Sequence, residues 1–380
     1  MRLGVIGYGQ RIRRMIAKIR QMDPSFQVTA INDIRNEVIR EELKKTGEDT
    51  PISFYDSAET MLEQAQLDGI LIGTRCSLHT NLACKVLSTG LPLFLEKPVS
   101  TNMEDLRKLQ AASRKSSSQV VVSFPMRSTP LVRLAKEIID SGKVGTIEHV
   151  QAANNVPYGS IYYQNWYRDE QETQGLFLQK ATHDFDCINF LLQDRPVAIC
   201  AMKSKQIFKG TKPAGLMCVH CDEQNTCLES AVVKHRNGEP VRGEYCCFAE
   251  DTGNEDSGSA LIRYRSGMHV AYSQNFFARQ DAQKRGALLF GYKGTIEYDL
   301  YTGVLQVYMH HTKRVERYQV NEGDEHHFGG DKRLALNFIN VVKGEDTSES
   351  PLESGILSAL MCLSAKASSE TDQFVPIRWD

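Results

Sequence analysis

Long hydrophobic runs are absent from this sequence of 380 residues, and no stretch approaches the roughly 20 apolar residues that a membrane-spanning helix needs. An excess of charge of one sign is also absent, because the formal net charge is −2 at pH 7. Proteins that bind nucleic acid or an anionic membrane usually carry a basic excess, so we expect neither partner. No signal-peptide pattern precedes the first apolar segment, residues 3–6, and we therefore expect a cytoplasmic protein.

Cysteine is too sparse for a disulfide scaffold, because ten cysteines are spread over the 380 residues. In a reducing compartment these cysteines are expected to be thiols or metal ligands. The composition, 41% hydrophobic and 24% charged, is typical of a soluble globular protein. A chain of this length is expected to form two domains.

A glycine-containing turn follows the first predicted strand, and its members are Gly7, Tyr8, Gly9, Gln10 and Arg11. A strand, a glycine turn and an amphipathic helix over residues 11–22 are typical of a dinucleotide-binding unit. Gly7 permits the tight turn, and Gly9 lets the backbone approach a pyrophosphate at the helix N-terminus. The third glycine position of the motif holds Ile12, which predicts looser contact between helix and strand.

The second predicted strand, residues 26–31, ends at Asn32 and Asp33. This spacing is near that of an acid that accepts hydrogen bonds from the ribose hydroxyls of the cofactor. A carboxylate there repels a 2′-phosphate and favours NAD over NADP, although Arg35 could soften that preference. In the alternative interpretation, Asp33 is only a turn or helix-capping residue.

Two more predicted strands, residues 68–72 and 91–98, also end in polar or charged residues. These residues are Thr74, Arg75 and His79 after the first strand, and Glu96 and Lys97 after the second. Open α/β sheets hold their ligands at the carboxyl ends of the strands, so Lys97 would stand at the mouth of a crevice. Alternatively, Lys97 forms a surface salt bridge, Thr74 only ends a strand and His79 only begins a helix.

The order and spacing of these motifs resemble the Gfo/Idh/MocA oxidoreductases. The resemblance rests on GYG at 7–9, Asp33, GTR…H at 73–79 and EKP at 96–98, and it continues in four later segments: 142–145, 166–168, 175–186 and 327–331. It implies an α/β protein with a Rossmann domain, a doubly wound parallel sheet, over residues 1–125. A C-terminal α/β domain over residues 126–380 is expected to carry a large, mainly antiparallel open sheet.

The resemblance also implies a reaction, NAD-dependent hydride transfer from a hydroxyl-bearing carbon of a sugar, polyol or glycoside. It implies that Lys97 and His183 converge on the substrate, and that Trp166 and Arg168 lie near the nicotinamide. Sugar and inositol dehydrogenases of the family usually carry an Asp four residues before this histidine. Here that position is Gln179, which cannot ionise, and the next residue, Lys180, is a candidate second cation.

The departure at Gln179 leaves other functions open. Some members with altered helix motifs oxidise a glycoside hydroxyl transiently and cleave the glycosidic bond without net redox change. A non-catalytic sensor of a dinucleotide or sugar is a further alternative. A preference for polyols fits polar residues that we expect to line the crevice, namely Asn154, Asn155, Tyr158, Tyr162 and Tyr163.

A cysteine cluster occurs in what reads as an insertion, about residues 209–247, and its members are Cys218, Cys221, Cys227 and Cys246. Thiolates at this spacing bind borderline metals, and four of them close a tetrahedral zinc site. An insertion with little core of its own would gain from such a structural metal. The spacing also allows an iron–sulfur cluster, and free cysteines are often only small buried hydrophobic residues.

Alternating apolar and polar runs recur between residues 148 and 310, as in an antiparallel sheet with one covered face. The other face of such a sheet needs cover, so we expect a homodimer or homotetramer.

Overall fold

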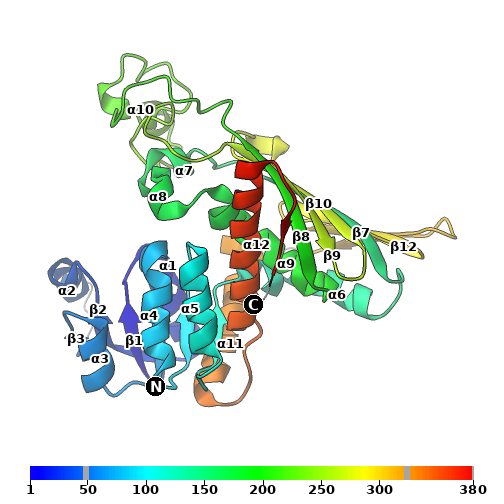
Figure 1. Cartoon of the computed structure of the whole chain (residues 1–380). Coiled ribbons are helices and arrows are strands. Elements are labelled where there is room, and N and C mark those ends of the chain that lie inside the picture. Colours follow the sequence, from blue (N-terminus) through cyan, green and yellow to red (C-terminus); the bar gives the residue numbers. More distant parts are fainter. Residues whose placement is uncertain (46–50, 321–325, 379–380) are drawn as a thin grey trace. The chain divides into compact units, whose positions relative to one another are not determined.

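The structure, a computed structural model, describes residues 1–45, 51–320 and 326–378. Over these residues the chain divides into two compact units, drawn in Figure 1. The first comprises Met1–Pro130 and Glu322–Leu360, and the second comprises Leu131–Asn321 and Met361–Asp380. The predicted boundary at residue 125 lies close to the first crossing, but the prediction missed the return of the chain to the first unit.

The described part of the first unit holds a six-stranded parallel sheet in the order β3-β2-β1-β4-β5-β6. The strands are β1 (Arg2–Ile6), β2 (Gln27–Asn32), β3 (Ser53–Phe54), β4 (Gly69–Ile72), β5 (Leu93–Leu95) and β6 (Val120–Val122). Every residue of β4, β5 and β6 is buried, as expected for a parallel sheet covered on both faces. The order is that of a doubly wound dinucleotide-binding fold, which confirms the predicted class.

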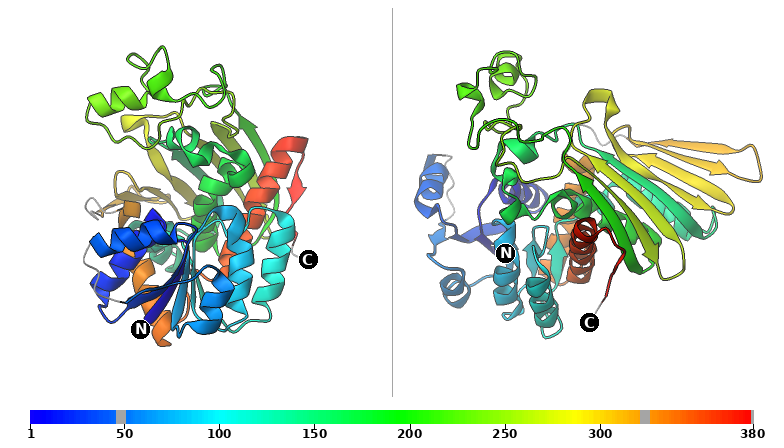
Figure 2. Two further views of the ribbon diagram at one scale, coloured as in Figure 1. Left: turned by 90° about the vertical axis from the view of Figure 1, so that its left-hand side faces the viewer. Right: turned by 45° about the horizontal axis from the view of Figure 1, so that its top comes forward.

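Helices cover both faces of this first sheet (Figures 1 and 2). They are α1 (Gln10–Met22), α2 (Asn36–Lys45), α3 (Ala58–Gln64), α4 (His79–Leu87), α5 (Met103–Ser113) and α11 (Gly330–Lys343). Ser57 and Asn102 accept hydrogen bonds from the first turns of α3 and α5, so side-chain caps set where these helices begin.

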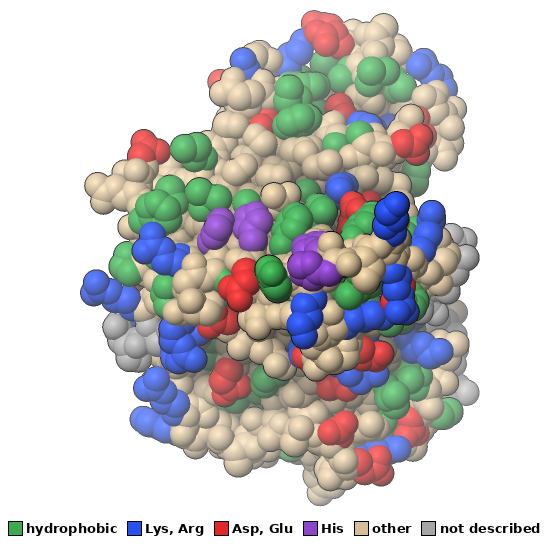
Figure 3. Space-filling model, turned by 90° about the vertical axis from the view of Figure 1, so that its right-hand side faces the viewer, with side chains coloured by type: hydrophobic (Ala, Val, Ile, Leu, Met, Phe, Trp, Pro, Cys, Tyr) green, Lys and Arg blue, Asp and Glu red, His purple; other side chains and the backbone are tan. Residues whose placement is uncertain are grey.

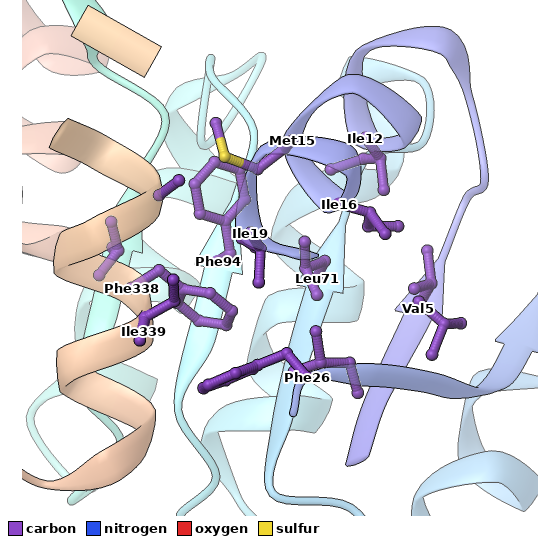
Figure 4. Packing of buried hydrophobic residues seen from close by; sticks show 14 of the residues in the cluster. Val5, Ile12, Met15, Ile16, Ile19, Phe26, Leu71, Phe94, Phe338 and Ile339 are labelled. Carbon is purple, nitrogen blue, oxygen red and sulfur yellow. The ribbon is translucent and has the colours of Figure 1, made fainter. Parts of the chain in front are cut away.

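Helix α11 explains why the chain returns to the first unit. Phe338 of α11 is fully buried and packs edge-to-face on Phe94 of β5, with ring centroids 5.6 Å apart. Figure 4 shows α11 and α1 contributing to one apolar cluster with the sheet. Burying an aromatic side chain of this kind stabilises a fold by about 2 kcal/mol or more. Helix α11, a segment distant in sequence, thus covers the part of this sheet face that α1 does not cover.

The described part of the second unit holds a nine-stranded mixed sheet, in the order β14-β13-β12-β11-β7-β10-β9-β8-β15. Its strands are β7 (Ile147–Asn155), β8 (Pro196–Ser204), β9 (Ser257–Tyr264), β10 (His269–Asn275), β11 (Lys284–Gly291), β12 (Gly294–Asp299), β13 (Val304–Met309), β14 (Val315–Gln319) and β15 (Val375–Pro376). Neighbours pair antiparallel, except that β7 and β10 are parallel. The mainly antiparallel sheet is confirmed. The sequence pattern predicts β7 to β13 but not β14 and β15 at the edges.

The helices of the second unit are α6 (Pro130–Asp140), α7 (Ile161–Gln164), α8 (Glu170–Thr173), α9 (Thr182–Leu192) and α10 (Ala231–Arg236). Helix α12 (Leu352–Thr371) is divided between the units at residue 360. Figure 2 shows helices against one face of the second sheet. The strand β9 alternates buried and exposed residues, which agrees with a sheet covered on one side.

The segment between β8 and β9, residues 205–256, contains the residues, about 209–247, that read as an insertion in the sequence. It contains the short helix α10, a 3₁₀ turn at Cys218–His220, two isolated β-bridges and long irregular stretches. The insertion has more core than expected, because Phe208 and Cys247 pack in an apolar cluster with Tyr163 and Phe276. Across the described residues, no helix is long and apolar enough to cross a membrane.

Candidate functional site

The carboxyl ends of neighbouring parallel strands meet at one edge of the first sheet. The backbone N–H of Gly7, which follows β1, donates to Asn32 O at 2.9 Å, and that of Gly73, after β4, donates to Ile6 O at 2.9 Å. The N–H of Glu96, after β5, donates to Ile72 O at 3.0 Å. Residues predicted from separate motifs therefore lie side by side at this edge, where the strand order reverses between β1 and β4.

The two glycines of the first turn have different physical requirements. Gly7 has a φ of +82°, and a Cβ there would lie 2.7 Å from a Thr74 methyl carbon, so the turn needs glycine. Gly9 is the N-cap of α1, and a Cβ there would meet Gly73 O at 3.6 Å, an ordinary contact. Among the described residues no side chain caps this end of α1. The free backbone donors at an open helix N-terminus fit the pyrophosphate of a dinucleotide.

The contact between α1 and the sheet is close, which corrects the expectation of a looser contact at Ile12. Ile12 is fully buried, and a Cβ on Gly73 would lie 2.0 Å from Ile12 Cγ1. The glycine that allows the close approach therefore directly follows β4 and does not stand at the third position of the turn motif.

Asp33 lies at the end of β2, where the sequence predicts the ribose-binding acid. Its carboxylate accepts hydrogen bonds from the N–H groups of Tyr8, at 2.8 Å, and Arg35, at 2.9 Å. The first bond ties Asp33 to the glycine turn, and the second is the turn interaction of the alternative interpretation. The side chain of Arg35 is 52% exposed and lies 3.6 Å from the same carboxylate.

His79, one of the residues predicted near the ligand edge, is buried at the start of α4. Its Nδ1 lies 2.8 Å from Pro98 O, and its Nε2 lies 3.2 Å from Thr74 O. Burial lowers the pKa of His79. The ring connects the segments after β4 and β5, so it positions Thr74 and Lys97 indirectly. Arg75 is exposed and Lys97 is partly exposed.

Arg11 and Glu96, both predicted to touch the cofactor, contact each other. The guanidinium of Arg11 donates to both oxygens of Asp331 on α11, at 2.6 and 2.7 Å, and to Glu96 at 3.0 Å. Although burial opposes the shift, these carboxylates raise the pKa of Arg11, and Arg11 with His327 lowers the pKa of Asp331. These side chains join α1, β5 and α11, a structural role that the motifs do not reveal.

In the second unit, the segment predicted as one helix over 175–186 is a π-helix, Phe177–Ala181, followed by α9. Gln179 is buried and donates from Nε2 to Thr173 O at 2.8 Å, so it has a structural bond where the family usually has an acid. His183 is 7% exposed, at the start of α9. Single π turns within helices are frequent at functional sites.

Asp184, next to His183, fixes α9 on the second sheet. Its carboxylate accepts hydrogen bonds from Asn154 at 2.7 Å, from Tyr272 at 2.8 Å and from Arg285 Nε at 2.8 Å. These partners stand on β7, β10 and β11, so one carboxylate ties the helix to the middle strands.

Lys180 of the π-helix is buried and donates a hydrogen bond to the hydroxyl of Tyr158. Burial lowers the pKa of Lys180. Burial alone would raise the pKa of Tyr158, but the cations Lys180, Arg285 and Arg242 outweigh it and lower that pKa. Sequence reasoning identified Lys180 as a candidate cation, and it missed Tyr158 as its partner.

Trp166 and Arg168 lie on a short 3₁₀ turn, Trp166–Arg168. Trp166 stacks on Tyr167 with ring centroids 3.8 Å apart. Arg168 is buried, pairs with Asp251 and lies 4.5 Å from the centre of the Tyr245 ring. Its guanidinium thus contacts the insertion, and the expected contact with a nicotinamide stays a prediction.

The predicted metal ligands Cys218, Cys221, Cys227 and Cys246 line one pocket of the insertion. All are free thiols. However, no group of three or more His, Cys, Asp or Glu side chains within residues 1–45, 51–320 and 326–378 is placed to hold a metal ion. Burial raises the pKa of Cys227 and Cys246, which favours neutral thiols over the thiolates that metals require. The predicted zinc or other thiolate-bound metal is therefore not supported.

Comparison with known families agrees with both units. Residues 1–124 match the oxidoreductase family with an NAD-binding Rossmann fold, and residues 132–297 match the GFO/IDH/MocA C-terminal domain. The chain belongs to the Gfo/Idh/MocA oxidoreductase family. The resemblance inferred from its motifs is thereby confirmed.

Individual relatives are distant. The oxidoreductase YteT of Bacillus subtilis is 26% identical over 269 residues, covering 64% of this chain and 62% of the relative. Myo-inositol 2-dehydrogenase of Thermotoga maritima is 25% identical over 194 residues, covering 50% of this chain and 55% of the relative. The match thus spans only between about half and three-fifths of these curated relatives.

Solved structures share the fold along their whole length. An oxidoreductase domain protein from Kribbella flavida superposes with a TM-score of 0.79 at 18% identity, covering 99% of each chain. A levoglucosan dehydrogenase, solved with NADH and levoglucosan, gives a TM-score of 0.77 at 15% identity and covers 100% of each chain. At these identities the similarity establishes the fold alone.

Proposed function

We propose that this protein is an NAD-dependent oxidoreductase that removes hydride from a hydroxyl-bearing carbon of a sugar, polyol or glycoside. The observation that carries the proposal is the open N-terminus of α1, with Gly7 and Gly9 beside it and Asp33 at the end of the next strand. Relatives named inositol 2-dehydrogenase support this substrate class. When bound, the nicotinamide accepts the hydride.

The dinucleotide would be held in the first unit. We assign its pyrophosphate to backbone N–H groups of the turn, its ribose to Asp33, and the rest of its contacts to the neighbouring strand ends. The proposed set is Gly7, Tyr8, Gly9, Gln10, Arg11, Asp33, Arg35, Thr74, Arg75, Glu96 and Lys97. The carboxylate of Asp33 favours NAD, and the exposed Arg35 leaves NADP as a weaker ligand.

Lys97 and His183 are the proposed catalytic side chains, and Lys180 is the candidate second cation. An alcohol that loses hydride must also lose its hydroxyl proton, and a cation steadies the developing alkoxide. Lys97→Ala should reduce turnover by about 10²-fold or more and raise the Kd for NAD much less, because other residues supply most of the proposed cofactor contacts. An unchanged rate would remove Lys97 from the mechanism.

The test of function is a panel of sugars, inositols and glycosides incubated with NAD, with absorbance of the reduced cofactor as readout. Net reduction supports the dehydrogenase. Gln179 in place of the usual acid favours one alternative, redox-neutral glycoside cleavage, which would release a chromogenic aglycone with no net NADH. NAD binding without either signal would favour a sensor.

We also propose a homodimer or homotetramer that covers the exposed face of the second sheet. Figure 3 shows exposed apolar side chains near histidines and basic side chains on one face of the molecule. Leu261 on β9 is 51% exposed, and Met202 on β8 is 70% exposed. Light scattering of the wild type and of Leu261→Asp measures the assembly, which the substitution should weaken.

A further inference from the structure

Gln179 leaves the proposed reaction without the acid that usually assists proton removal in this family. The structure offers another group within the second unit. Tyr158 follows β7, and its hydroxyl accepts a hydrogen bond from Lys180 of the π-helix. Tyr158 is partly exposed, whereas Lys180 is 5% exposed.

We propose that Tyr158 takes the hydroxyl proton of the substrate as a tyrosinate and that Lys180 is the positioning residue that stabilises this anion. The inference rests on the proposed dehydrogenase function and names its proton acceptor. As the substrate C–H bond breaks, its electron pair leaves as hydride to the oxidised nicotinamide. The O–H bond breaks at the same carbon, its proton forms a bond to Tyr158 Oη, and its electron pair becomes the second bond of the carbonyl.

The position of Tyr158 is fixed by the backbone that follows it. A Cβ on Gly159 would lie 1.9 Å from Phe276 O, so only glycine permits this close approach of the loop to the strand end. The ammonium of Lys180 lies 4.7 Å from the centre of the Tyr158 ring, and the guanidinium of Arg242, from the insertion, lies 5.1 Å from it. Cations from separate elements thus surround one tyrosine.

Charged and titratable groups from several elements lie around Tyr158. The cations are Lys180 of the π-helix, Arg285 of β11 and Arg242 of the insertion, and the neutral phenols are Tyr162 and Tyr301. The carboxylate of Asp184 acts on Lys180, and its salt bridge to Arg285, at 2.7 Å, offsets its charge. Lys180 donates its hydrogen bond to the phenol of Tyr158. A buried lysine with a purely structural role usually pairs with a carboxylate instead.

Lys180 contacts Tyr158 from within the π-helix. The π-helix ends at Ala181, so Lys180 and His183 belong to different helical repeats. The arrangement resembles a general base prepared by an adjacent cation. A phenol whose pKa is lowered ionises nearer neutrality, and the phenolate that forms accepts the proton.

The first arm of the experiment is spectroscopic and needs no substrate. We expect near-ultraviolet absorbance of the full-length protein, with and without NAD, to show one tyrosinate titrating below the ordinary tyrosine range of about pH 10. Tyr158→Phe should remove that titration. The control variant Tyr301→Phe should retain it, because burial raises the pKa of Tyr301 and keeps its hydroxyl protonated in the wild type. Lys180→Met should move it to higher pH, and Lys180→Arg should largely preserve it.

The second arm is kinetic and uses the substrate found by the panel. Tyr158→Phe should lower kcat by about 10²- to 10⁴-fold with a small change in KM. In wild type the rate should fall as pH drops through the titration of Tyr158, and Lys180→Met should shift this limb to higher pH. His183→Asn should leave the limb in place.

The outcomes separate two kinds of failure. An active wild type with an equally active Tyr158→Phe, or a limb that moves with His183→Asn and not with Lys180→Met, overturns the role of Tyr158 and leaves the dehydrogenase standing. Absence of a tyrosinate titration below the ordinary range also overturns it. A wild type that reduces no NAD with any substrate overturns the proposed function itself.

Discussion

Each unit buries a cluster of charged side chains, and the two clusters differ in how their charges are matched. In the first unit Arg11 meets the carboxylates of Asp331 and Glu96, and the shifts in pKa keep Arg11 and Asp331 ionised. In the second unit Lys180 meets the phenol of Tyr158, and both pKa values shift toward neutrality. A matched cluster of ions holds elements together, whereas a mismatched one can exchange a proton.

The largest expected effect comes from unmatching the first cluster. Asp331→Asn leaves Arg11 with an amide in place of a carboxylate that binds it through both oxygens. We expect the free energy of unfolding to fall by about 3 kcal/mol, the low end for a buried pair because Arg11 retains some exposure. Urea unfolding measures this. Asp23→Asn, which removes a partly exposed pair with Lys343, is the control and should change stability far less.

The same pair predicts a dependence of stability on pH. The folded state depresses the pKa of Asp331, so its contribution is fully present above the unfolded value of about 3.9 and is lost as pH falls through the folded pKa. The gap in unfolding free energy between wild type and Asp331→Asn should therefore narrow as pH is lowered below about 4. A gap that stays constant in acid would show that the stabilisation is not ionic.

An intermediate effect is expected where α1 meets β4. Gly73→Ala should destabilise the first unit by about 1–3 kcal/mol, because the new methyl overlaps Ile12. Ile12→Ala alone should also destabilise by leaving a cavity. In the double variant the two small side chains fit, so its loss should be less than the sum of the single losses. If the two single losses of unfolding free energy simply add in the double variant, the proposed close contact between Ile12 and Gly73 is contradicted.

The smallest effect concerns cofactor choice. Asp33→Asn keeps a hydrogen-bond acceptor for Tyr8 or Arg35 but removes the negative charge near a 2′-phosphate. We expect the Kd for NAD to rise by about tenfold or less, roughly 1.4 kcal/mol, while the Kd for NADP changes less or falls. Calorimetric titration with both cofactors measures the ratio. Equal losses for NAD and NADP would remove Asp33 from the ribose site.

The sequence predicts the fold class well because its strongest signals are local. Apolar strands followed by glycine, Asp33 and EKP identify the parallel sheet and its ligand edge, and alternating runs identify the second sheet. The return of α11 could not be predicted, since an amphipathic helix does not specify which sheet it covers. The burial of His79 depends on how the segments after β4 and β5 pack together, and Arg11 pairs with Asp331 at a separation of 320 residues, so no spacing rule reveals either contact.

The sequence predicts only one of the two side chains paired in the second unit, for the same reason. Lys180 stands out because a cation follows an altered family position, whereas Tyr158 is one tyrosine among several polar residues of its segment. The signal that could have identified it is the glycine that follows it, which the close contact with Phe276 requires. The cysteines gave a false positive prediction: their spacing is typical of zinc sites, but among the described residues their side chains are not placed to hold a metal ion.

The central claim is that a dinucleotide binds at the open end of α1, and calorimetric titration of NAD into wild type and Gly9→Ala tests it most directly. The added methyl has room in the protein alone, since its nearest neighbour would be Gly73 O at 3.6 Å. We predict an unchanged unfolding midpoint and a Kd for NAD raised by at least about tenfold. An unchanged Kd in Gly9→Ala, or no NAD binding by the wild type, would contradict the claim.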